Sequence, residues 1–123
     1  MIGNYLTENN RQLSRFGFPK EARKSMIILI EQIHDFKSYR ESTLYLAVNI
    51  ADRYLQKLAT DGSPAPQLEL LAVVSVLLAA KYNEPMLPNF NNMVIMMYIK
   101  FSKRIEQKDL IDLERQILIK LDF

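Results

Sequence analysis

The sequence predicts an all-helical domain built from five main helices, and three observations support this class. Apolar residues recur at spacings of three and four, whereas no segment alternates with the period of two that is typical of a strand. Glycine and proline are scarce inside the periodic segments and gather between them. One segment, at about 67–83, is apolar on nearly every side, which predicts a helix at the centre of the bundle.

The first half of the chain predicts three helices. A short N-terminal helix at about 8–16 ends at Gly17 and Pro19, and a first main helix follows at about 20–36. Ser38 and Glu41 have the spacing of a capping box, which favours a second main helix from there through the segment TLYLAVNIADRYLQKL at 43–58.

The second half predicts three more helices, separated by proline-containing loops. The segment DGSPAP at 61–66 is expected to be a loop because each proline disfavours helix at the residue before it. After the central helix, Pro85 and Pro88 interrupt the chain, and a short helix is expected at about 89–97. The last helix is expected at about 107–121, with five aliphatic residues on one face.

Composition sets limits on the class of protein. Apolar residues make up 49% of the chain, which is enough for one core, and sixteen basic and fourteen acidic residues are interspersed. We therefore expect no dedicated nucleic-acid surface. The absence of cysteine fits a reducing intracellular compartment, the nucleus, the cytoplasm or both. We expect no signal peptide and no membrane span, because the longest uncharged apolar stretch has eleven residues.

Four charged residues lie where helical spacing predicts core. Arg23 precedes an apolar face by one turn, Asp52 lies on the inner side of its helix, Lys81 follows Leu77 and Leu78 by one turn, and Glu114 lies between apolar residues four positions away on either side. Such charges either pair inside the fold, face a partner that pairs with them, or lie at helix edges and reach water. The spacing leaves these alternatives open.

Three segments of the chain resemble the cyclin box, the helical domain of cyclins, in the form found in A/B-type mitotic cyclins. They read TLYLAVNIADRYL at 43–55, LELLAVVSVLLAAKYNE at 68–84 and DLERQILIKLDF at 112–123. The resemblance covers about 20–123 and leaves 1–19 as an N-terminal helical extension. It implies a five-helix bundle, and its hallmark positions fall on Arg23, Asp52, Leu70, Lys81 and Glu114.

The resemblance also implies a role for each hallmark charge. Arg23 and Asp52 are expected to form a buried structural ion pair between the first two helices of the box. Lys81 and Glu114 are expected to bind the backbone of a cyclin-dependent protein kinase beside its regulatory helix. Additional apolar contacts with the kinase are implied for Leu78, Tyr82, Leu118 and Phe123, for which ordinary core packing is the alternative. No cofactor, metal or catalytic residue is implied.

The chain departs from the family pattern in three places. Family members that recruit substrates carry an apolar groove on the first helix, whereas the corresponding residues here include Ala22, Ser25, Gln32 and Glu69, so recruitment through this groove is not expected. The connection from Lys81 to Glu114 is about four residues longer than usual, around 93–103. Most cyclins also continue into a second, similar box, so the chain is either a fragment or a one-box member.

Other functional classes have weaker support in the sequence. His34 is the sole histidine and is expected to be structural or solvated rather than catalytic, and three glycines cannot supply a phosphate loop. Met93, Met96 and Met97 suit core filling, with an adaptable binding surface as the alternative. The competing functional hypotheses are a transcription-factor type of adaptor and a cyclin-fold scaffold that binds proteins without activating a kinase.

Overall fold

The computed structural model describes residues 19–122, which form five helices and no strand. The helices are α2 (Lys20–Lys37), α3 (Glu41–Asp61), α4 (Leu68–Asn83), α5 (Phe90–Phe101) and α6 (Gln107–Lys120). The predicted all-helical class is confirmed. The short helix expected at about 8–16 lies outside the described residues, as does Phe123.

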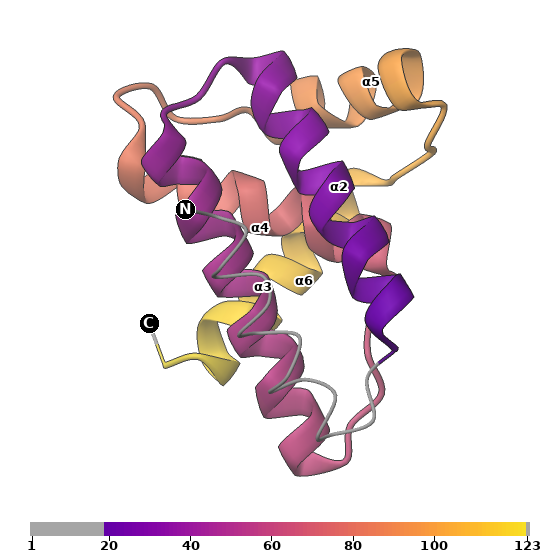
Figure 1. Ribbon diagram of the computed structural model, residues 1–123. Helices are drawn as coiled ribbons and strands as arrows, with labels where there is room; N and C mark the ends of the chain where they lie inside the picture. The colour runs from indigo at the N-terminus through magenta and orange to yellow at the C-terminus, as the bar shows by residue number, and fades with distance from the viewer. Residues whose placement is uncertain (1–18, 123) are drawn as a thin grey trace.

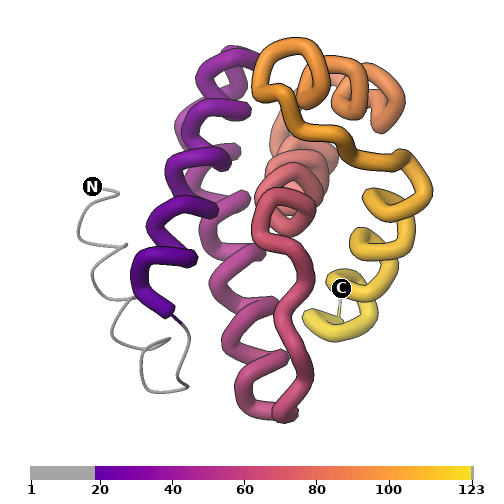
Figure 2. The backbone as a smooth tube through the Cα atoms, turned by 90° about the vertical axis from the view of Figure 1, so that its right-hand side faces the viewer, coloured from indigo at the N-terminus to yellow at the C-terminus, as the bar shows by residue number. Residues whose placement is uncertain are grey.

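The apolar helix α4 lies at the centre of the bundle. It runs between the pair formed by α2 and α3 on one side and α6 on the other (Figures 1 and 2). Each of its residues from Leu71 to Ala80 is buried, which explains why its sequence lacks the polar stripe of a surface helix. The expectation of a central apolar helix is therefore also confirmed.

The helices around α4 each bury one apolar stripe against it. On α2 the stripe contains Met26, Ile27, Leu29, Ile30 and Ile33; on α3 it contains Ala47, Val48, Ala51, Tyr54, Leu55 and Leu58; and on α6 it contains Leu110, Leu113 and Ile117. Each stripe follows the helical repeat of three and four residues, so burial on one side and solvent on the other accounts for the sequence pattern.

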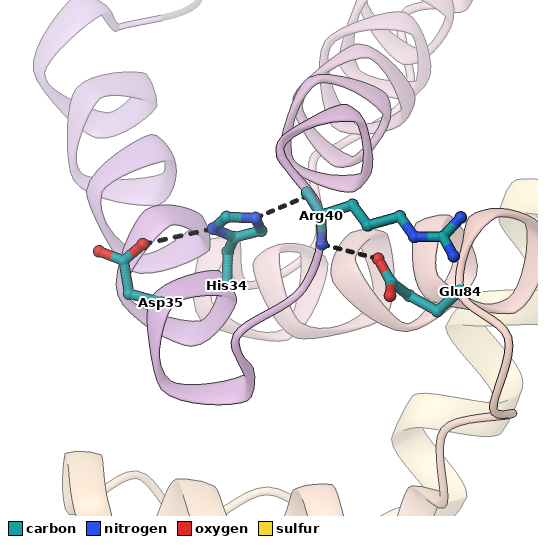
Figure 3. A network of polar contacts seen from close by, with 4 residues as sticks. All are labelled: His34, Asp35, Arg40 and Glu84. Carbon is teal, nitrogen blue, oxygen red and sulfur yellow. Dashed lines mark hydrogen bonds and ion pairs between the residues drawn. The ribbon is translucent and has the colours of Figure 1, made fainter.

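The start of α3 differs from the predicted capping box. Ser38 lies in the left-handed region at φ 54°, where it ends α2, and the α3 N-cap is Arg40, whose side chain forms no capping bond. The acceptor comes from beyond the end of α4 instead. Glu84 Oε2 accepts the Arg40 backbone N–H at 2.9 Å (Figure 3). The same oxygen accepts a hydrogen bond from the Thr43 hydroxyl. A distant carboxylate therefore replaces the local cap.

His34 supports the same corner of the bundle. Its Nε2 donates to the Arg40 carbonyl at 2.8 Å, and its Nδ1 lies 3.3 Å from Asp35 Oδ1 (Figure 3). The Arg40 guanidinium in turn donates to the backbone carbonyl of Asn83 at 3.2 Å. These contacts join the ends of α2, α3 and α4, which is the structural role expected for the histidine.

Helix α5 is longer than predicted. The sequence favoured an end near Met97, whereas α5 continues to Phe101 because no glycine or proline interrupts it. Ser102 then takes a left-handed conformation at φ 54°, and the Lys103 N–H bonds the Met97 carbonyl at 3.0 Å. The Met97 carbonyl also accepts the Ser102 N–H, so two backbone bonds to one carbonyl close this end of the helix without a glycine.

Candidate docking site

A buried ion pair joins α2 to α3. Arg23 Nε donates to Asp52 Oδ1 at 2.8 Å, and a terminal guanidinium nitrogen donates to Oδ2 at 2.6 Å. The two side chains are 2% and 6% exposed. The fork geometry satisfies both carboxylate oxygens in a place where water is excluded. The structure therefore brings together the two residues that the sequence left as awkward charges inside apolar stripes.

A second ion pair lies at the surface between α4 and α6. Lys81 Nζ donates to Glu114 Oε2 at 2.7 Å, and the two side chains are 35% and 13% exposed. Lys81 belongs to the last turn of α4, where the partial negative charge of the helix end favours a cation. Its Nζ also lies 5.5 Å from the centre of the Phe90 ring at the start of α5.

The surface pair retains hydrogen-bonding capacity for a partner. An ammonium group has three donors and a carboxylate has about four acceptor positions, so the Lys81–Glu114 bond uses only part of each. The pair therefore presents a donor and an acceptor within a few ångströms of each other. A partner backbone segment offers the complementary carbonyl and N–H groups.

The predicted apolar contacts fall into different environments. Tyr82 is 63% exposed and directly follows Lys81 in the sequence, so its ring lies at the surface. Leu118 is partly buried against the core, whereas Leu78 lies inside the core at 1% exposure. Because the Leu78 side chain has almost no surface to offer, the structure favours the core alternative for it. Phe123 lies outside the described residues.

The sequence reasoning missed three exposed apolar residues near the surface pair. Met86 and Leu87 protrude from the loop after α4, and Ile111 lies on α6 three residues before Glu114. The prolines at positions 85 and 88 flanking the loop pair were a signal, because they hold a short segment out of any helix. Large apolar side chains beside a charged pair suit a surface that a partner covers.

The methionine cluster of α5 lies inside the protein. Met93, Met96 and Met97 are all buried, so the core-filling alternative is confirmed and the cluster offers no binding surface. No group of three metal-binding side chains occurs between residues 19 and 122. Across the same residues, no helix is long and apolar enough to cross a membrane.

The face of α2 that was not expected to recruit substrates does carry a groove. It has a volume of about 320 Å³ and runs between α2, the start of α4 and the segment after α5. Its walls include Ala22, Met26, Leu29 and Gln32. At its rim Lys103 Nζ lies 3.5 Å from Glu69 Oε1, an ion pair that brings a cation to the groove.

Comparison with known proteins identifies one matching family and several relatives. The sequence model of the family described as "Cyclin, N-terminal domain" matches residues 3–123. The G2/mitotic-specific cyclin-3 of Saccharomyces cerevisiae is 37% identical over 101 residues, which cover 82% of this chain and 22% of that protein. The G2/mitotic-specific cyclin-B of Spisula solidissima is 36% identical over 105 residues, covering 81% of this chain and 22% of that protein.

A plant relative gives a similar picture. Cyclin-B2-2 of Arabidopsis thaliana is 29% identical over 109 residues, covering 89% of this chain and 24% of that protein. The chain thus spans about a quarter of the length of the curated relatives it matches. No solved structure matches it significantly.

Proposed function

The chain belongs to the cyclin family, and we propose that it binds and activates a cyclin-dependent protein kinase in cell-cycle control. The observation that carries this proposal is the Lys81–Glu114 pair at the surface between α4 and α6. Both side chains keep free hydrogen-bonding positions, and two exposed apolar residues are close to them in the sequence: Tyr82 follows Lys81, and Ile111 lies three residues before Glu114 on α6. Charged groups within a ring of apolar surface become desolvated when a partner docks, as at an interface hot spot.

In the proposed complex, Lys81 donates to a backbone carbonyl of the kinase and Glu114 accepts from a backbone N–H. Tyr82 and Leu118 add apolar contact, and Leu78 supports them from the core. The domain itself carries out no chemistry in this proposal. Docking holds the regulatory helix of the kinase inward. This completes an ion pair within the kinase itself, between its own lysine and glutamate, that phosphoryl transfer requires.

Activation in this scheme is a population shift. The domain activates only if it binds the active kinase conformation better than the inactive one. Binding without a difference in affinity between the two conformations makes the chain a scaffold, so kinase activity is measured together with binding. The two readouts separate a regulatory subunit from a protein that only recruits others.

The test uses the full chain and a panel of purified cyclin-dependent kinases. We expect Lys81→Ala and Glu114→Ala each to abolish detectable binding to the kinase that the wild type binds, measured by biolayer interferometry, and to remove its stimulation. Lys57→Ala, a change of the same kind at an exposed residue of α3, is the matched control and should bind as the wild type does. Retained binding in both surface-pair variants, with the control also bound, contradicts the site.

A further inference from the structure

The loop between α3 and α4 carries a serine that is followed by proline. Ser63–Pro64 is the one place in the sequence where a serine or threonine directly precedes proline. Residues 63–67 belong to no helix, and both Pro64 and Ala65 are exposed. Proline also disfavours helix at the residue before it, so Ser63 lies on extended backbone that a modifying enzyme can take up without unwinding a helix.

The Ser63 side chain is not needed to end α3. Gly62 takes the left-handed conformation at φ 72°, and the Ser63 N–H donates to the Leu58 carbonyl at 2.9 Å. Main-chain atoms therefore close the helix. The Ser63 hydroxyl forms no hydrogen bond with any residue between 19 and 122, so it is available as an acceptor of a transferred group.

Ser63 lies on the wall of a hollow between this loop and the end of α6. The hollow has a volume of about 410 Å³, and its lining includes Tyr54, Gln116 and Lys120 as well as Ser63 and Pro64. Figures 1 and 2 show the end of α6 beside the last turns of α3. A phosphate group on the serine would therefore have room between the loop and α6.

Two groups in the hollow can bind a phosphate. Lys120 Nζ pairs with Asp61 Oδ2, but an ammonium has three donors, and the Asp61 side chain is 47% exposed and can turn to water. The Tyr54 side chain is buried at 4% exposure, and its hydroxyl forms no hydrogen bond in the part of the chain that the structure describes. Burial raises the pKa of Tyr54 and the charge of Lys120 opposes this rise, so the phenol stays protonated at neutral pH and can donate.

We propose that Ser63 is a phosphorylation site for proline-directed serine/threonine kinases and that the hollow receives the phosphate. Such a kinase accepts proline after the serine because proline has no N–H that would need a partner in the complex. The inference is independent of the proposed docking through Lys81 and Glu114.

The reaction consumes ATP. A bond forms between the Ser63 Oγ and the γ-phosphorus, the bond from that phosphorus to the bridging oxygen breaks to release ADP, and the hydroxyl proton passes to the catalytic base of the kinase and then to solvent. The product carries close to two negative charges at neutral pH, so it competes with Asp61 for Lys120. With a further bond from the Tyr54 hydroxyl, the phosphate ties the α3–α4 loop to α6.

The first test asks whether the site is used. The full chain is incubated with ATP and either of two purified proline-directed kinases, a mitogen-activated protein kinase or an active cyclin-dependent kinase, and mass spectrometry locates the phosphate. Ser63→Ala should abolish incorporation, and Pro64→Ala should slow it about tenfold. Ser25→Ala, at an exposed serine of α2 that is not followed by proline, should react within about twofold of the wild type. No incorporation at Ser63 by either kinase, or undiminished incorporation in Ser63→Ala, overturns the proposal.

The second test asks where the phosphate lies. Phosphorus NMR of the phosphorylated chain gives the second pKa of the phosphoserine. This pKa should be higher in Lys120→Ala than in the wild type, because the ammonium favours the dianion, and Tyr54→Phe should raise it by a smaller amount. Lys108→Ala, at an exposed lysine at the other end of α6, is the matched control and should titrate as the wild type does. Identical titrations of the wild type and Lys120→Ala overturn the assignment of the hollow.

Discussion

The two ion pairs of this domain have similar chemistry and very different surroundings. Arg23–Asp52 joins α2 to α3 with both side chains almost fully buried, whereas Lys81–Glu114 joins α4 to α6 with Lys81 about one-third exposed. The buried pair uses two hydrogen bonds in a fork, and the surface pair uses one. Burial thus makes one pair part of the scaffold, while exposure leaves the other available for recognition.

The largest expected effect comes from breaking the buried pair. Arg23→Ala or Asp52→Ala should lower the free energy of unfolding by about 3–5 kcal/mol, because each leaves an uncompensated charge in the core. Urea unfolding followed by circular dichroism measures the loss. A loss under about 1 kcal/mol would show that the pair behaves like an exposed one and would remove the contrast between the two sites.

A double replacement separates the cost of a lone charge from the worth of the pair. In Arg23→Met/Asp52→Leu both charges are absent, so no buried group is left unpaired. The free energy of unfolding of the double variant should be close to that of the wild type or higher, although each single change lowers it. A loss as large as the sum of the single variants would instead mean that the pair itself is a major source of stability.

An intermediate effect is expected at Glu84, which starts α3. Burial raises the pKa of its carboxyl, but hydrogen bonds from Thr43 and the Arg40 N–H, with the nearby charges of Arg40 and His34, outweigh this and hold the pKa below the ordinary value of 4.5. The contribution to stability is therefore present above pH 4.5 and is lost as the pH falls through the lowered pKa. Glu84→Ala should cost about 1 kcal/mol at neutral pH, as for a lost helix cap.

The pH dependence identifies the carboxylate as the cause. Urea unfolding is compared from neutral pH down to about pH 3. Glu84→Gln keeps an acceptor oxygen without the charge, so its stability should change less over this range than that of the wild type. Equal slopes for the two proteins would assign the acid sensitivity to other carboxylates.

The smallest effect on stability is expected at the surface pair. Lys81→Ala and Glu114→Ala should each change the free energy of unfolding by about 0.5–1 kcal/mol, because water screens the charge that remains. Added salt should reduce even this difference. The measurement is urea unfolding at low and high ionic strength. A loss as large as that at Arg23 would make Glu114, the less exposed partner, a scaffold residue and would undermine its assignment to docking.

Patterns confined to one helix predicted most of the fold. The five helices followed from the apolar repeat, because a helix that buries one face needs an apolar residue at every third or fourth position. The central place of α4 followed from its being apolar on nearly every side. It also marked Arg23 and Asp52 as charges in the wrong place, although their mutual pairing came from the resemblance. Lys81 and Glu114 stood out for the same reason, and their proposed role in docking came from the family resemblance.

The errors occurred where distant residues decide the local structure. The capping-box spacing of Ser38 and Glu41 is a local rule, but Glu84, which lies 44 residues from Arg40, supplies the acceptor. The end of α5 depended on Ser102 adopting a left-handed conformation that sequence alone does not favour. The sequence did not decide between core and surface for Leu78, because an entirely apolar helix gives no indication of which side faces outward.

The Glu84 contact makes the first residue of α3 a property of the whole domain. A peptide of α3 alone lacks the Glu84 acceptor for the Arg40 N–H. We therefore expect the first turn of α3 to fray in the peptide and to stay helical in the domain. Glu84 follows Lys81 by three residues, at the same end of α4. The surface pair and the acceptor that fixes the start of α3 therefore lie within one helical turn of each other.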